Sequence, residues 1–203
     1  MSNVDAGHPD LRQEICDAVN QVMMKDDFPS EHRMQQPASP DQVTIRCQRT
    51  WHDITTLNPR LDGGSFSACI AEFDQDGEIF SFFVEAAQTP ERPAWGIAGW
   101  SGGRQPPELR DQMGGFMISG GSHVCVGGMG RVPDGGTLRV EMADGTMHES
   151  TATDSCAIVF APVTTPPSPN DHIIVSWYDA SGVELGSDRV WIGDGRTPPP
   201  RPQ

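Results

Sequence analysis

The stretch that decides the fold is Leu138-Arg139-Val140-Glu141-Met142-Ala143-Asp144-Gly145, in the last third of the chain. Apolar residues alternate with charged ones at its start, which places the apolar side chains on one face of a β-strand. The Asp-Gly pair then ends the run, because glycine readily adopts the positive φ of a tight turn. The pattern therefore predicts a β-hairpin with one buried face.

Similar apolar runs separated by turn residues occur in the rest of the chain. Residues 173–177 and 183–192 flank one turn, and residues 66–73 and 79–87 flank another, Asp74-Gln75-Asp76-Gly77. Shorter strands are predicted at residues 43–47, 95–100, 116–118, 123–126 and 156–160. Many short strands joined by turns at irregular spacing predict an all-β fold, namely an antiparallel β-sandwich of immunoglobulin-like type.

The N-terminal part of the chain has the spacing of an amphipathic helix. Leu11, Ile15, Ala18, Val19 and Val22 recur three and four residues apart. We therefore expect a helix and a polar, proline-rich linker in residues 1–40, a sandwich domain in residues 41–193 and a disordered proline-rich tail in residues 194–203. The apolar stripe leaves open whether the helix packs on the domain or docks elsewhere.

Charge and composition narrow the classes of partner. The formal net charge of the 203 residues is −14, and a field of that sign repels phosphate backbones and anionic lipids. No run approaches about 18 consecutive apolar residues, and the first nine residues lack the pattern of a secretory signal. We expect no nucleic-acid partner, no membrane insertion and a cytoplasmic location.

The five cysteines are odd in number and never occur in Cys-x-x-Cys spacing. This argues against a disulfide framework and against a zinc knuckle. We expect the cysteines to be small buried core residues.

Three segments carry a resemblance to a known kind of domain: residues 130–135, 138–146 and 175–182. Together they resemble a small β module of uncharacterised actinobacterial proteins, which carries a GxVPDG…VxVxLADG…VxAYDAxG pattern. Many of those proteins are similar to membrane-anchored or anti-sigma-associated proteins whose outer part is this module. Because the shared residues form turns and core positions, the resemblance implies a β fold and supplies no catalytic residue.

One segment matches a catalytic motif. Gly99-Trp100-Ser101-Gly102-Gly103 has the Gly-x-Ser-x-Gly spacing of the nucleophile elbow of serine hydrolases. That chemistry requires a serine on a sharp turn from strand to helix, and the prolines that follow at 106 and 107 oppose a helix there. A glycine-rich loop is the preferred interpretation, and a hydrolase centred on Ser101 is an alternative.

Two patterns could begin a metal site. The acidic turn Asp74–Gly77 resembles the start of a calcium loop, but a hairpin turn explains its aspartates and glycine directly. His123 and Cys125 share one face of a strand, but two ligands are fewer than a metal centre needs. We therefore predict no metal and no cofactor, and assign no catalytic residue.

The binding candidates are Trp95, Trp100 and Ser101, which lie within or beside a glycine-rich segment. Exposed indole rings could line a groove for a ligand or carbohydrate. The leading hypothesis is a non-enzymatic accessory or regulatory protein that contacts another protein, or a second copy of itself, through the N-terminal helix and residues 95–103. A ligand- or carbohydrate-binding module that uses exposed tryptophans is the first alternative.

Overall fold

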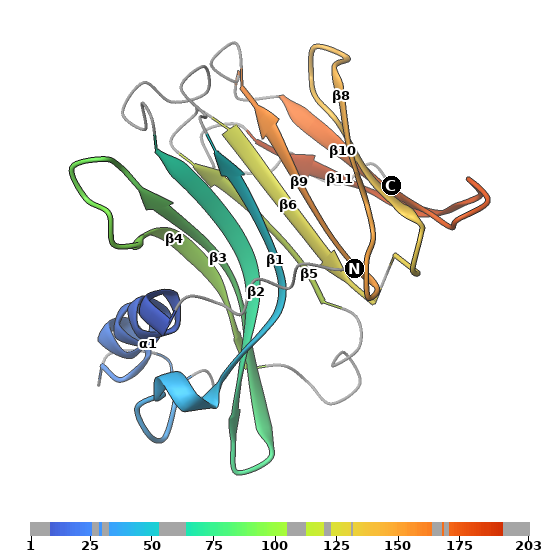
Figure 1. Cartoon of the computed structure of the whole chain (residues 1–203). Coiled ribbons are helices and arrows are strands. Elements are labelled where there is room, and N and C mark those ends of the chain that lie inside the picture. The colour runs from blue at the N-terminus through green and yellow to red at the C-terminus, as the bar shows by residue number, and fades with distance from the viewer. Residues whose placement is uncertain are drawn as a thin grey trace. The chain divides into compact units, whose positions relative to one another are not determined.

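The computed structural model describes residues 9–25, 29, 33–52, 64–104, 113–119, 123–130, 132–163, 168 and 171–192 (Figure 1). The chain divides into two compact units, Met1–Gly115 and Phe116–Gln203. Each unit has its own hydrophobic cluster. The predicted fold class, all-β and antiparallel with an N-terminal helix, is confirmed. The predicted tail at residues 194–203 lies outside the described residues.

The first unit is one antiparallel sheet, here called sheet A, with a helix packed on it. Its elements in chain order are α1 (Pro9–Met23), the short 3-10 helix η1 (Pro40–Gln42), β1 (Val43–His52), β2 (Ser65–Gln75), β3 (Glu78–Gln88) and β4 (Gly96–Arg104). The strands lie in the order β1-β2-β3-β4, so each pairs with the next along the chain. Strands β1 and β4 are therefore the edges of sheet A.

The tight turn between β2 and β3 confirms the hairpin interpretation of Asp74–Gly77. Asp76 and Gly77 have φ values of 55° and 82°, and the Asp74 carboxylate accepts a hydrogen bond from the Gly77 amide at 2.9 Å. The aspartate and the glycine thus shape the turn itself.

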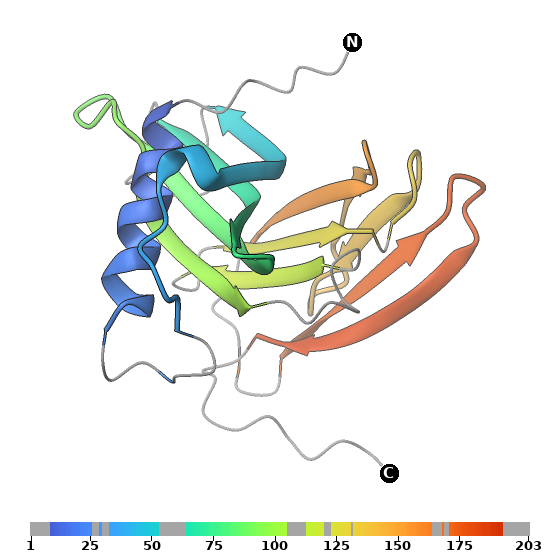
Figure 2. The ribbon, with the colours of Figure 1, turned by 90° about the horizontal axis from the view of Figure 1, so that it is seen from below.

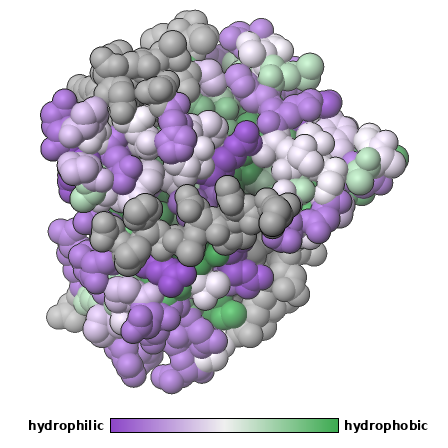
Figure 3. All heavy atoms as spheres, in the orientation of Figure 1, coloured by the Kyte–Doolittle hydropathy of each residue, from purple (hydrophilic) through white to green (hydrophobic). Residues whose placement is uncertain are grey.

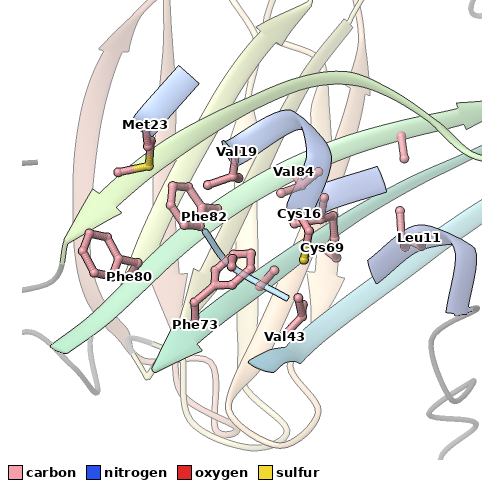
Figure 4. Packing of buried hydrophobic residues seen from close by; sticks show 14 of the residues in the cluster. Leu11, Cys16, Val19, Met23, Val43, Cys69, Phe73, Phe80, Phe82 and Val84 are labelled. Carbon is pink, nitrogen blue, oxygen red and sulfur yellow. The ribbon is translucent and has the colours of Figure 1, made fainter. Parts of the chain in front are cut away.

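Helix α1 packs on sheet A through an apolar stripe that matches the predicted one at Leu11, Ile15 and Val19, whereas Ala18 and Val22 are only half-buried. Its fully buried side chains, each at most 1% exposed, are Leu11, Ile15, Cys16, Val19 and Met23. They share one hydrophobic cluster with Phe73, Phe80 and Phe82 of β2 and β3 (Figure 4). Burying one large apolar side chain contributes about 1.5–3 kcal/mol, against a total stability of about 5–15 kcal/mol for a typical domain. The helix is therefore an integral part of the first unit.

The predicted linker between the helix and the first strand is in part anchored to the unit. Asn20 in α1 accepts a hydrogen bond from the Ala38 amide at 2.8 Å and donates one to the Ala38 carbonyl at 2.9 Å. Gln75 donates to the carbonyl of Gln36 at 2.7 Å, and Met34 is 1% exposed. The unit boundary consequently falls between Gly115 and Phe116 instead of at residue 40, because helix, linker and sheet share one core.

The second unit is a small β-sandwich. Its elements are β5 (Met113–Ser119), which spans the unit boundary, β6 (His123–Met129), β7 (Thr137–Glu141), β8 (Met147–Thr151), β9 (Cys156–Pro162), β10 (His172–Tyr178) and β11 (Glu184–Trp191). They form one sheet in the order β5-β6-β9 and another in the order β11-β10-β7-β8. One hydrophobic cluster joins the two sheets. It contains Val126 and Val159 of the β5-β6-β9 sheet together with Val140 and Ile173 of the β11-β10-β7-β8 sheet. The alternation of apolar and charged residues in β7 thus buries one face of its sheet.

Both predicted C-terminal hairpins are present. Gly145 between β7 and β8 and Gly182 between β10 and β11 have φ values of 83° and 85°. In the second turn the Asp179 carboxylate accepts hydrogen bonds from the amides of Ser181 and Val183 at 2.8 and 2.9 Å. These bonds, and above all the one from the Ser181 hydroxyl, lower the pKa of Asp179 below its ordinary value.

Two sequence expectations need correction. Residues 101–104 belong to strand β4 instead of a loop, because they continue the pairing of β4 with β3 as far as Arg104. The cysteines were all expected to be buried core residues outside any disulfide. Cys16, Cys69 and Cys125 are indeed buried, whereas Cys47 and Cys156 are disulfide-bonded. Within the described residues, no helix is both long and apolar enough to cross a bilayer.

If α1 belongs to the core of the first unit, truncating Ile15 must destabilise the whole unit. We expect Ile15→Ala to lower the free energy of unfolding by about 2–5 kcal/mol, because it leaves a cavity between helix and sheet. The matched control is Gln13→Ala, an exposed position of the same helix, with an expected change within about 0.5 kcal/mol. Urea unfolding followed by circular dichroism measures both. Equal stabilities of the two variants would contradict this packing.

Candidate functional site

The two candidate tryptophans differ in solvent exposure, but neither is fully exposed. Trp95, just before β4, is 5% exposed and belongs to the core of the first unit. Trp100, within β4, is half-buried and packs edge-on against Phe82, with ring centroids 5.4 Å apart and an interplanar angle of 84°. The two rings therefore do not form a shared exposed platform for a sugar or another flat ligand.

Ser101 lies within a regular strand. It pairs with Phe83 of β3 in the middle of the β3–β4 ladder, whereas a nucleophile elbow is a sharp turn from strand to helix. The glycine that follows has a structural role. Gly102 has a φ of 148°, and a Cβ at this position would overlap the Ser81 carbonyl oxygen and lie 2.8 Å from the Phe82 Cα. The motif is thus explained by close approach of β4 to β3.

The polar residues considered as metal ligands are also placed by packing. His123 is 5% exposed, and its ring stacks on Phe160 with centroids 4.7 Å apart. Cys125 is fully buried. In the part of the chain that the structure describes, no three histidine, cysteine or acidic side chains gather closely enough to hold a metal ion.

The structure instead reveals a groove in the first unit that sequence reasoning did not locate. It has a volume of about 710 Å³ and lies between α1 on one side and the end of β3, the β3–β4 loop and the start of β4 on the other. The lining residues are Glu14, Asp17, Ala18, Asn20, Gln21, Ala87, Thr89, Arg92, Gly96, Ile97 and Ala98. We call this space the α1–β4 groove.

One wall of the α1–β4 groove is a face of the helix that is polar except for Ala18. Glu14, Asp17, Ala18 and Gln21 occur at three- and four-residue spacing and therefore share one face. This face flanks the apolar stripe that packs on sheet A, so burial of the stripe fixes the direction in which the carboxylates point. Figure 3 shows mainly hydrophilic residues where α1 lies, at the lower left of the view.

The opposite wall is held by a short loop with its own hydrogen bonds. Thr89 and Arg92 exchange two backbone hydrogen bonds, each 3.0 Å long. The Arg92 amide also bonds the Thr89 hydroxyl at 3.1 Å, and the Gln88 side chain donates to the Pro93 carbonyl at 2.9 Å. Such a closed loop presents its side chains in a defined position on the groove.

Arg92 lies directly against the start of β4. A Cβ at Gly96 would come within 3.2–3.4 Å of the three guanidinium atoms nearest to it. The absence of a side chain at Gly96 thus gives the Arg92 guanidinium room beside the strand. The groove consequently carries a positive group on the loop wall and two negative groups, Glu14 and Asp17, on the helix wall.

Two buried cysteines of the first unit have raised pKa values, and the charge of Asp17 contributes at one of them. Burial, followed by the charge of Asp17, raises the pKa of the Cys16 thiol to about 11. Burial alone raises the pKa of Cys69 to about 12. Thiols with such pKa values stay protonated at neutral pH and are poor nucleophiles.

The chemistry of the lining residues suits binding better than catalysis. Among the described residues that line the groove there is no histidine, cysteine or serine, so these residues offer no nucleophile paired with a general base. The same set contains no aromatic ring. They combine small apolar side chains, amides, a guanidinium and two carboxylates, which can hold a flexible polar chain.

Part of this site can be recognised in the sequence. The helix and residues 95–103 were both expected as contact surfaces, and both contribute to the α1–β4 groove. The polar residues beside the apolar stripe marked the helix wall in principle. No local pattern marked Thr89 or Arg92, because their role depends on where the β3–β4 loop meets the helix.

Comparison with known proteins adds no constraint on the function. No protein-family model matches the chain, and no curated protein is significantly similar to it.

If Gly102 serves the packing of β4 on β3, adding one methyl group there must destabilise the first unit. We expect Gly102→Ala to lower the free energy of unfolding by about 3 kcal/mol, from backbone strain at positive φ and steric overlap with β3. The neighbouring Gly103→Ala is the control, since no atom lies within 4 Å of its added Cβ. Thermal and urea unfolding compare the two. A neutral Gly102→Ala variant would show that this glycine is not needed for packing.

Proposed function

We propose that this protein is a non-enzymatic accessory protein that binds another protein by receiving a segment of that partner in the α1–β4 groove. The observation that carries the proposal is the convergence of α1 and the start of β4 on one groove. These two segments are far apart in the sequence, and each is fixed by burial of its neighbours in the same hydrophobic cluster. A rigid framework with an open polar groove suits recognition of a chain segment.

The other candidate functions have less support in the first unit. A sugar-binding platform would need exposed, parallel indole rings, whereas Trp95 is 5% exposed and Trp100 is half-buried against Phe82. A serine hydrolase would need Ser101 on a turn, whereas it lies within β4. The net charge of −14 favours a protein partner over a nucleic acid.

A peptide-display experiment tests the proposal on the full chain. Random peptides are selected on the immobilised protein, and the affinity of the selected peptides is measured by fluorescence polarisation. We expect Ala98→Trp to weaken binding by at least about tenfold, which is about 1.4 kcal/mol, because the indole fills the groove at an exposed position of β4.

The matched control is Thr44→Trp, at an exposed position of the opposite edge strand, β1. It should bind the peptides like the unmodified protein. Failure to select any peptide, or equal binding by Ala98→Trp and Thr44→Trp, would contradict the proposal. Deletion of residues 1–40 is not a suitable test, because α1 supplies part of the core.

Sedimentation of the protein alone shows whether a second copy of the chain is the partner.

A further inference from the structure

We propose that the segment bound in the α1–β4 groove is extended, pairs with the free edge of β4 as an added strand and places a lysine or arginine side chain beside Glu14 and Asp17. This inference rests on the proposed function, since it specifies how the partner segment is held. It follows from the position of β4 in sheet A, from the sequence of β4 and from the charge of the helix wall.

Strand β4 is an edge strand. Among the strands that the structure describes, it is the last of sheet A and pairs only with β3. One side of an edge strand has main-chain amides and carbonyls without a strand partner. An extended peptide can use those groups to join the sheet, with main-chain hydrogen bonds supplying affinity.

The sequence of β4 does not protect this edge. Natural edge strands are often guarded by charged side chains or proline. β4 has neither from Gly96 to Gly103, and its only charged residue is the final Arg104. The opposite edge strand, β1, carries exposed Arg46 and Arg49. The two edges of one sheet thus differ in charge, and the edge without charged side chains from Gly96 to Gly103 is the one beside the groove.

A β-bulge adjusts β4 at the groove. The β3–β4 register shifts between Glu85 and Ala86, so that Gly99 pairs with Glu85, Ile97 pairs with Ala86, and Ala98 has no partner in β3. Bulges bend a strand and re-aim its side chains, and they are frequent at sheet edges and beside functional sites. Ala98 is exposed and lines the groove. Its small side chain leaves room for a neighbouring chain.

The helix supplies a second boundary for the added strand. Figure 2 shows α1 running along sheet A, and Glu14, Asp17, Ala18 and Gln21 form its wall of the groove. Binding of an extended peptide between an edge strand and a helix is a known mode of strand addition. Successive side chains of such a peptide point to opposite sides. Every second residue therefore faces the helix wall, and the residues between them face away from it.

The negative charges of Glu14 and Asp17 on the helix wall favour a basic side chain at the position of the partner segment that faces them. Glu14 and Asp17 are three residues apart, which places their Cβ atoms about 5–6 Å from each other. Glu14 is half-buried, so its charge is less screened by salt than that of a fully exposed group. A lysine or arginine of the partner complements this pair, and the net charge of −14 favours the approach of a basic segment. Arg92 on the loop wall disfavours a second basic residue at that end.

The backbone part of the inference is tested with N-methylated peptides. A peptide selected on the full chain is synthesised with a single N-methyl group at each position in turn. We expect methylation at every second position to weaken binding by about tenfold or more, because only alternate amides of an added strand donate to β4. The positions between them should tolerate the methyl group. A pattern with a period of three or four, or no periodicity, would overturn strand addition.

The charge part is tested with the double variant Glu14→Gln/Asp17→Asn. We expect it to weaken binding about tenfold and to reduce the salt dependence of the affinity, whereas Asp41→Asn in η1, an exposed acidic position outside the groove, should change neither. Replacing the basic residue of the peptide by glutamine should have the same effect as the double variant. An unchanged affinity, or selection of acidic peptides that need Arg92, would overturn the assignment of a basic side chain.

These experiments distinguish binding in the groove, strand addition to β4 and recognition of a basic side chain. If no peptide is selected, or if Ala98→Trp binds as well as Thr44→Trp, the proposed function itself is wrong. If Ala98→Trp blocks binding but methylation shows no alternation, the groove binds a segment that is not an added strand. If methylation alternates but the charge variants have no effect, strand addition stands and the basic side chain is wrong.

Discussion

Burial of the apolar stripe of α1 against sheet A is the interaction on which the first unit depends. Leu11, Ile15 and Val19 lie in the same cluster as Phe73 and Phe82, and burial of each large apolar side chain contributes about 1.5–3 kcal/mol. The same contact turns the neighbouring polar face of the helix, with Glu14 and Asp17, toward β4. Stability and the candidate site therefore share one physical cause.

Glycine has two separate roles in and around β4. Gly102 allows close approach to β3, where any side chain would overlap the backbone. Gly96 leaves space that the guanidinium of Arg92 occupies. Neither role involves chemistry at Ser101. A glycine-rich segment that matches a catalytic motif can thus be explained by packing, once the φ values and neighbouring atoms are known.

Local patterns were sufficient to predict the elements but not their assembly. Alternation in β7 and the Asp-Gly turn after it predicted a hairpin that is present, and the spacing from Leu11 to Val22 predicted α1. Strand β4 was underestimated because its glycines and exposed positions hide the alternation, and only pairing with β3 extends it to Arg104. The burial of Trp95 and the disulfide-bonded state of Cys47 depend on long-range contacts that no local pattern contains.

The groove could be predicted only in part for the same reason. Its helix wall follows from helical periodicity, while its loop wall depends on Thr89 and Arg92, which are ordinary surface residues in the sequence.

Hydrogen exchange of the full chain, with and without a selected peptide, tests the account most directly. We predict slower exchange of the amides in β4, with unchanged exchange in β1. Protection of β1, or of the second unit alone, would contradict the account.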